Sequence, residues 1–392
     1  MGKRDTMPQA NRKMKDIEVP GTRQFANRVE EFPDAVDLTL GQPDFETPQP
    51  IKDAAIEAIN TRSMKYSHNT GLFELRETIS QYYREMHGAE YDPDGEVLVT
   101  VGGSEGIDGI LRAILDPGDE VLIPAPTYLG YEPIIELCGA VTKFVDMTPT
   151  GHIATPELIE SNITEKTKAV LLNYPTNPTG VTYTKPQMDA LVEVFRKHDI
   201  FVITDEIYAE NTLEGEHISL ASYTDIKEQV LVVNGLSKSH AMTGWRIGYV
   251  VGHRTIMEDV TAVHLYNTIC AALPSQYAAI EALKNHRHVP KEMNEAYIER
   301  RDYIYRRLLD MGLEVSKPTG AFYIFPSIRK YDTDSFRFAT NLLESTQLAV
   351  VPGRSFSEFG EGHIRLSFAC SMAELEEAAD RLERYINTLE EK

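Results

Sequence analysis

The sequence predicts an α/β protein in which a large, mainly parallel sheet is flanked by helices and a smaller α+β domain follows toward the C-terminus. The chain has 392 residues, which is two to three times the length of a typical domain, so we expect more than one core. From about residue 95 short apolar runs alternate with longer amphipathic stretches, which is typical of parallel strands joined by helices. After residue 286 long helical patterns are mixed with a few further apolar runs, which indicates a second unit.

The large domain is expected over residues 46–285. Its helices are predicted from capping residues and apolar spacing: Ser104 is expected to cap a helix that runs to about Leu115, and Pro186 lies in the first turn of a helix over 185–197. Its strands are predicted from apolar runs at 96–101, 120–124, 140–146, 168–173, 200–204 and 229–234.

The smaller domain is expected over residues 286–392. Helices rich in Glu, Arg and Tyr extend to about Met311, and two more are predicted near 335–345 and 372–389. The intervening strands are predicted at 321–327, 348–352 and 363–368. Residues 1–45 are interrupted by Pro and Gly, and we expect this N-terminal segment to pack on the smaller domain.

Composition excludes several classes of protein. The chain has 60 acidic and 39 basic residues and a formal net charge of −21, which disfavours nucleic acid as a partner. The cysteines Cys138, Cys270 and Cys370 are too widely spaced for a disulfide framework or a CxxC metal site. No apolar run reaches the length of a membrane span, and the N-terminus lacks the apolar core of a signal peptide. We therefore expect a cytoplasmic protein without a metal or a membrane partner.

The glycine-rich turn at residues 102–106 allows three interpretations. Its sequence GGSEG matches the GxSxG nucleophile elbow of α/β-hydrolases, with Ser104 as nucleophile and His363 as a possible base. The same small residues at the start of a helix could hold a phosphate through free N–H groups. The third interpretation is an ordinary turn between a strand and a helix.

Polar residues also follow two other predicted strands. Asp205 ends the run at 200–204, and Asn177 lies in the NYPTNPTG turn after 168–173. Ligands bind at the carboxyl ends of parallel strands, so both side chains are candidate ligand contacts, with a helix cap or a plain turn as the alternatives. Tyr208, three residues after Asp205, is expected on the same side. A Walker B assignment fails because the chain has no GxxxxGK[ST] loop.

The segment 235–248, GLSKSHAMTGWRIG, carries the strongest chemical signal. It places Ser237, Lys238 and Arg246 among glycines and small or apolar residues after an apolar strand. Desolvation and the nearby Arg246 favour the neutral lysine amine that a Schiff base requires, although a single lysine is commonly only a solvated charge. We assign His240 to structure, since nothing in the sequence pairs with it.

Taken together, these motifs resemble the class I aminotransferases that depend on pyridoxal phosphate and have the type I fold of this cofactor's enzymes. The resemblance covers nearly the whole chain and is closest to the bacterial aminotransferase A group, whose members act on aromatic amino acids or N-acetyl-LL-diaminopimelate. The matching motifs, in chain order, are GQPDF at 41–45, YSHNTGLFELR at 66–76, GGSEG at 102–106, PTY at 126–128, NPTG at 177–180, DEIY at 205–208, SKSHAMTGWR at 237–246 and RLSF at 365–368.

The resemblance implies a role for each residue that contacts the cofactor ring. Lys238 would form the Schiff base and then move the proton between the substrate and the cofactor. Asp205 would keep the pyridine nitrogen protonated. Tyr208 and Asn177 would bond the phenolic oxygen, while Tyr128 would stack on the ring.

The resemblance also implies how the phosphate and the substrate are held. The phosphate would rest on the turn formed by Gly103, Ser104 and Glu105, with Ser237 and Arg246 adding a hydroxyl and a charge. The substrate carboxylate would bind Arg365 beside Asn177, with the backbone near Gly41 closing over it. Tyr66 would reach the phosphate of the neighbouring subunit in a homodimer with shared active sites; the alternative for Tyr66 is a buried core side chain.

The implied reaction is a ping-pong transfer of the amino group from an L-amino acid to a 2-oxo acid such as 2-oxoglutarate. We expect aromatic donors (Tyr, Phe and Trp) first, and N-acetyl-LL-diaminopimelate as the alternative. More remote alternatives are a carbon–sulfur lyase on the same scaffold and the serine hydrolase. A regulatory domain that binds pyridoxal phosphate would require a fused DNA-binding segment, for which the N-terminal segment is too short.

Overall fold

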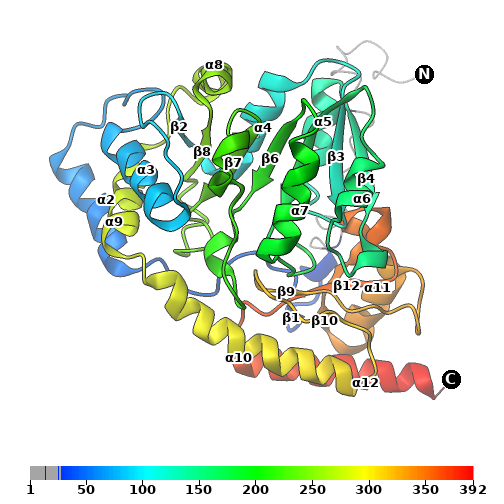
Figure 1. The fold of residues 1–392 in the computed structure, drawn as a ribbon. Helices are drawn as coiled ribbons and strands as arrows, with labels where there is room; N and C mark the ends of the chain where they lie inside the picture. Colours follow the sequence, from blue (N-terminus) through cyan, green and yellow to red (C-terminus); the bar gives the residue numbers. More distant parts are fainter. Residues whose placement is uncertain (1–13, 15–24, 26–27, 392) are drawn as a thin grey trace, which may run out of the picture.

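The computed structural model describes residues 14, 25 and 28–391, and its centre is a seven-stranded sheet (Figure 1). The strand order is β2-β8-β7-β6-β5-β3-β4, and all neighbours are parallel except β8, which runs antiparallel to β2 and β7. The strands are β2 (Val97–Thr100), β3 (Glu120–Ala125), β4 (Val141–Asp146), β5 (Thr167–Asn173), β6 (Phe201–Asp205), β7 (Val230–Gly235) and β8 (Gly248–Gly252). The predicted α/β class with a mainly parallel sheet is confirmed.

Strand β8 was not predicted from the sequence. It is a five-residue strand that begins and ends with glycine. The segment between β7 and β8 is the loop that carries Lys238, with no helix between the two strands. The alternation of strands and helices therefore gives no sign of it. At Gly248 a Cβ atom would lie 2.7 Å from the backbone nitrogen of Gly103, so glycine lets β8 approach the start of the helix that follows β2.

Helices cover both faces of this sheet because successive strand residues point to opposite sides. Leu98 packs in the core formed with α4 and α8, whereas the adjacent Val99 packs in the core formed with α3 and α9. None of the described helices is long and apolar enough to cross a membrane. The helices of this unit are α2 (Gln49–Thr61), α3 (Phe73–His87), α4 (Gly102–Ile114), α5 (Tyr131–Cys138), α6 (Pro156–Glu160), α7 (Lys185–Phe195), α8 (Arg254–Thr268) and α9 (Leu273–Asn285).

The second core lies below the large sheet in Figure 1, where α10 and α12 run side by side. Its helices are α10 (Val289–Asp310), α11 (Ser335–Thr346) and α12 (Met372–Glu390). Its antiparallel sheet has the order β11-β12-β9, from Val351–Pro352, Ile364–Ser367 and Tyr323–Ile324.

Short 3-10 turns occur in both units. They lie at Thr148–Thr150, Ala209–Asn211, Leu220–Ser222, Thr224–Ile226, Gly353–Phe356 and Glu358–Gly360.

The N-terminal segment contacts this second core where it is described. Strand β1 (Val36–Asp37) pairs in parallel with β10 (Leu348–Ala349), and Phe25 and Leu38 are buried in the same cluster. The predicted single strand over 348–352 is divided at Val350, because β10 pairs with β1 while β11 pairs with β12. Most of residues 1–27 lie outside the described part of the chain.

The prediction that Ser104 caps a helix is wrong. Helix α4 already begins at Gly102, its N-cap is Val101, and no side chain caps it. Gly102 has a φ of +77°, which turns the chain immediately after β2 and places Ser104 inside the first helical turn. A Cβ atom on Gly102 would lie 2.6 Å from Nη2 of Arg246, so glycine also makes room for this guanidinium group.

Candidate active site

A cavity of about 590 Å³ lies at the carboxyl edge of the large sheet and reaches the second core. It is lined by most of the site residues predicted from sequence, namely Gly41, Gly103, Ser104, Tyr128, Asn177, Asp205, Tyr208, Ser237, Lys238, Arg246 and Arg365. Glu105 and Tyr66 do not line it. The edge position follows from the parallel strands, whose carboxyl ends meet on one side.

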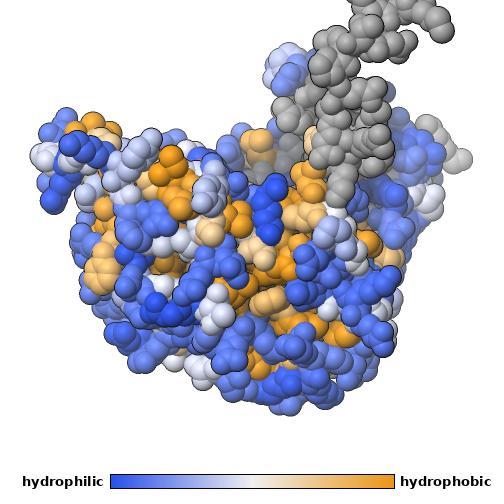
Figure 2. Space-filling view, turned by 90° about the horizontal axis from the view of Figure 1, so that it is seen from above, coloured by the Kyte–Doolittle hydropathy of each residue, from blue (hydrophilic) through white to orange (hydrophobic). Residues whose placement is uncertain are grey.

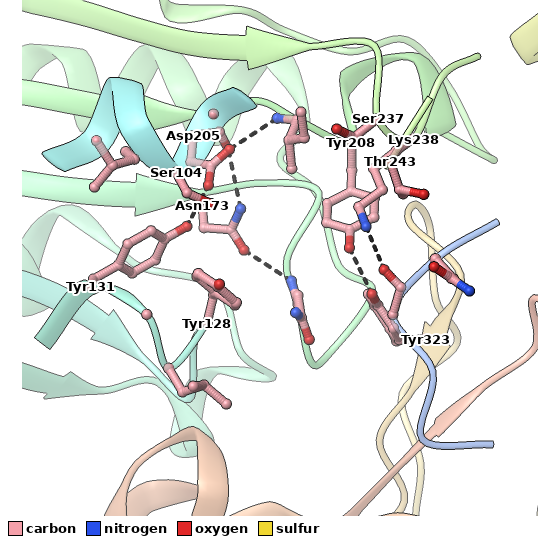
Figure 3. Close-up of a pocket in the computed structure, with 18 of the residues that line it drawn as sticks. Ser104, Tyr128, Tyr131, Asn173, Asp205, Tyr208, Ser237, Lys238, Thr243 and Tyr323 are labelled. Carbon is pink, nitrogen blue, oxygen red and sulfur yellow. Dashed lines mark hydrogen bonds between the residues drawn. The ribbon is translucent and has the colours of Figure 1, made fainter. Parts of the chain in front are cut away.

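Asp205, the last residue of β6, provides a buried carboxylate in this cavity (Figure 3). Tyr131 donates a hydrogen bond of 2.7 Å to Oδ2, and the backbone nitrogen of Ile207 donates one of 3.1 Å to Oδ1. Burial raises the pKa of the Asp205 carboxyl, against the lowering effect of these two hydrogen bonds. A buried acid of this kind suits a protonated ring nitrogen, which would compensate its charge.

Lys238 reaches the other end of the cavity from the loop after β7. Its Nζ donates a hydrogen bond to the carbonyl oxygen of Gly41 and lies 5.7 Å from the centre of the Tyr208 ring. Burial lowers the pKa of the lysine amine to about 8, and the positive charge of Arg365 contributes to this shift. A neutral amine is therefore accessible close to neutral pH, as attack on an aldehyde requires.

Arg365 enters from strand β12 of the second core. Its Nη1 donates to Oδ1 of Asn177 at 2.8 Å, and its Nη2 donates to the carbonyl oxygen of Thr39 at 2.6 Å. The guanidinium carbon lies 4.4 Å from the Tyr323 ring centre and 5.0 Å from that of Phe356. Nε is buried and has no hydrogen-bond partner. This rigid, desolvated cation with an unused donor suits a carboxylate ligand.

The start of α4 offers several groups that suit an anion. Gly103 and Ser104 in its first turn line the cavity, as do Ser237 and Arg246. Arg246 is held by a hydrogen bond of 3.1 Å from its Nη1 to the carbonyl oxygen of Thr243. Backbone N–H groups, a helix dipole and a guanidinium group together suit a phosphate monoester.

The two predicted residues that do not line the cavity differ in their surroundings. The carboxylate of Glu105 faces away, toward His264 and the backbone nitrogen of Val101. The Tyr66 side chain is 80% exposed, so the alternative of a buried core tyrosine is wrong.

Sequence analysis missed several residues that complete the cavity. Tyr323 shares a hydrogen bond of 2.7 Å with Tyr208, oxygen to oxygen, and stacks on Arg365. Asn173 at the end of β5 donates to the carbonyl oxygen of Asp205 at 3.2 Å. Tyr131 lies three residues after Tyr128, at the start of α5, which was a usable signal, whereas Tyr323 lies in an apolar run that is typical of a core strand.

The geometry does not fit the serine hydrolase. Among the described residues, Ser104 makes no hydrogen bond to a histidine, and His363 stacks on Phe325 with ring centres 5.0 Å apart. The Nδ1 atom of His363 faces the carbonyl oxygen of Glu361 at 3.3 Å. The serine therefore lacks the base that a nucleophile elbow needs.

Comparison with known proteins agrees with this chemistry. Residues 33–382 match the family described as aminotransferase class I and II. The chain is 47% identical to a probable N-acetyl-LL-diaminopimelate aminotransferase of Bacillus subtilis strain 168 over 376 residues, which cover 96% of this chain and 95% of the relative.

Solved structures show the same similarity. An aromatic aminotransferase of Pyrococcus horikoshii OT3 matches with a TM-score of 0.89 and 38% identity, over 93% of this chain and 99% of that one. A double mutant of Thermus thermophilus aspartate aminotransferase matches with a TM-score of 0.92 and 36% identity, over 96% and 100% of the two chains. An anion site, a buried acid and a lysine around one cavity fit the phosphate, ring nitrogen and aldehyde of pyridoxal phosphate. The chain is thus an aminotransferase of the class I and II family, whose members depend on pyridoxal phosphate.

Proposed function

We propose that this aminotransferase takes the amino group from N-acetyl-LL-diaminopimelate and passes it to 2-oxoglutarate by a ping-pong mechanism. The single observation behind the residue roles is that Lys238, Asp205 and Arg365 line one cavity. The similarity to the Bacillus subtilis relative supports the choice of donor.

The lining of the cavity supports a set of cofactor contacts. When bound, pyridoxal phosphate supplies the electron sink that allows an amino acid to lose its α-proton. Asp205 holds a proton on the ring nitrogen, and Tyr131 keeps the carboxylate in place. Lys238 would take up and return the α-proton of the donor at its Nζ, a role that its lowered pKa supports.

The remaining contacts orient the two ligands. Gly103, Ser104, Ser237 and Arg246 bind the phosphate, and Tyr128 covers the ring. Arg365 binds the substrate carboxylate beside Asn177, which fixes the α-carbon near Lys238. Tyr208 and Asn177 bond the phenolic oxygen of the cofactor.

Aromatic amino acids are the second candidate donors. The cavity has an apolar wall that includes Leu129, Ile134 and Phe356, and Leu129 packs against the small core cluster to which Phe356 belongs. Such a wall suits an aromatic ring. A panel of donors assayed with 2-oxoglutarate distinguishes the candidates: the proposal requires N-acetyl-LL-diaminopimelate to have the highest kcat/KM, and a higher value for Tyr, Phe or Trp would contradict it.

We also propose a homodimer with shared active sites. Tyr66 is 80% exposed, Tyr266 is 88% exposed, and Ile56 and Ile59 of α2 are more than half exposed in the single chain. Figure 2 shows apolar side chains at the surface of the face seen from above. Burying such side chains against a second copy would stabilise a dimer, with Tyr66 placed at the partner's cofactor phosphate.

We also propose a reducing compartment such as the cytoplasm, which is supported by three cysteines without a disulfide.

Subunit complementation tests the shared site. A Lys238→Ala chain is mixed with a chain in which Tyr66 carries a substitution that severely lowers activity in its own homodimer. With shared sites, both defects fall into one site of the heterodimer and the other site is intact. Activity should then recover toward half of the parent value per dimer. No recovery after demonstrated subunit exchange would contradict the proposal.

A further inference from the structure

The first turn of α4 carries a negative charge beside the proposed phosphate site. Glu105 follows Ser104 directly and is the acidic residue of this turn. A carboxylate at a helix N-terminus is attracted by the same backbone dipoles that would bind a phosphate, and it repels a phosphate through its own charge. The helix can serve as an anion site only if this carboxylate is held away and its charge is compensated.

His264 of α8 holds this carboxylate. Its Nδ1 lies 3.0 Å from Oε1 and 3.1 Å from Oε2 of Glu105, and the backbone nitrogen of Val101 donates to Oε2 at 3.1 Å. The His264 side chain is fully buried, and that of Glu105 is 12% exposed. The pair is thus shielded from solvent. A charge interaction in such a buried environment is stronger than one on the surface.

Both ring nitrogens of His264 face oxygen atoms. Nε2 faces the carbonyl oxygen of Asn69 at 3.0 Å, which can only accept a hydrogen bond. On the other side Nδ1 faces the Glu105 carboxylate and, at 3.2 Å, Oγ1 of Thr268, whose proton is directed to the carbonyl oxygen of His264. Each ring nitrogen therefore has an oxygen acceptor within hydrogen-bond distance, so both N–H groups of an imidazolium would have a partner.

We propose that His264 is a positioning residue for cofactor binding, which turns Glu105 away from the start of α4 and compensates its charge so that the phosphate can bind there. This inference rests on the phosphate site of the proposed function. It assigns a role to Glu105 that differs from the sequence-based one, because only the backbone of this residue would face the phosphate and its side chain belongs to the pair with His264.

The test compares two ligands that differ only in the phosphate. Pyridoxal phosphate and pyridoxal are titrated into the cofactor-free protein, and dissociation constants are measured from the absorbance of the bound ligand. His264→Gln keeps a hydrogen-bond donor for Glu105 but removes the positive charge. We expect this substitution to raise the dissociation constant of pyridoxal phosphate by roughly tenfold, the order expected for one uncompensated charge near the anion. The dissociation constant of pyridoxal should stay within about twofold of the parent value.

The double variant Glu105→Gln/His264→Gln removes both charges. It should bind pyridoxal phosphate to within about threefold of the parent, since the repulsion is gone. His286→Gln is the matched control, because His286 pairs with Glu281 at 3.1 Å and neither residue lines the cavity. This control should change neither dissociation constant.

Two results would overturn the inference. One is an equal loss for both ligands in His264→Gln, which indicates a purely structural role. The other is a double variant that binds pyridoxal phosphate as weakly as the single one.

Removal of one partner from a buried ion pair can prevent folding. If His264→Gln does not fold, Glu105→Gln decides: pyridoxal phosphate should bind as tightly as in the parent or tighter, and a loss specific to this ligand overturns the inference. A parent protein that binds no pyridoxal phosphate would instead refute the proposed function.

Discussion

Replacing Arg365 by lysine tests how the substrate carboxylate is held. The arginine offers a planar fork, it is fixed by Asn177 and the Thr39 carbonyl oxygen, and it lies between the rings of Tyr323 and Phe356. Lysine keeps the positive charge but presents a single compact donor group. Because the substituted side chain keeps its charge, the experiment isolates geometry from electrostatics.

The expected cost can be worked out from these contacts. Loss of one charge-assisted hydrogen bond to the carboxylate costs about 1.5–3 kcal/mol. Weaker stacking between the two rings adds about 0.5–1 kcal/mol. We therefore expect a loss of about 2–4 kcal/mol in transition-state stabilisation, which lowers kcat/KM by roughly 30-fold to 900-fold.

Steady-state kinetics with several amino donors and 2-oxoglutarate provide the assay. The loss should be similar for all α-amino acids, because each carries the carboxylate that Arg365 is proposed to bind. Arg329→Lys is the control: this arginine is exposed, and its Nη2 donates to the carbonyl oxygen of Glu361 at 3.2 Å. Equal kcat/KM for parent and Arg365→Lys, or a loss confined to one donor, would refute the reasoning.

Three further predictions concern the cofactor contacts. The rate at which Lys238 captures pyridoxal phosphate should rise with pH around a midpoint near 8, measured by borohydride fixation and peptide mapping; a midpoint near 10.5 would show that burial does not lower its pKa. Tyr131→Phe removes the 2.7 Å donor to Asp205 and should further raise the pKa of this carboxyl, so the absorbance of the bound cofactor should titrate at different pH values in variant and parent. Ser104→Ala should weaken cofactor binding and be rescued in part by excess pyridoxal phosphate, whereas complete loss of activity at saturating cofactor would contradict a role limited to phosphate binding.

Local patterns in the sequence were sufficient for the fold class, and they pointed to most of the candidate residues that line the cavity. The apolar runs are continuous because the sheet is covered on both faces: the adjacent residues Leu98 and Val99 are both buried, in opposite cores. The polar residues after these runs, including Asp205, lie at one edge because parallel strands share their direction. Strand β8 escaped prediction because a short antiparallel return after a loop does not produce the alternation.

Only the tertiary structure decided which side chains come into contact and which hydrogen bonds and charge interactions they make. Arg365 and Tyr323 lie in two separate apolar runs that are typical of core strands, and packing of the second core against the large sheet places them beside Asn177 and Tyr208. Glu105 belongs to the motif that predicts a phosphate site, yet its carboxylate faces His264, far along the chain. The physical reason is that hydrogen bonding, desolvation and charge compensation depend on neighbours in space, whereas periodicity and turn residues act through neighbours in sequence.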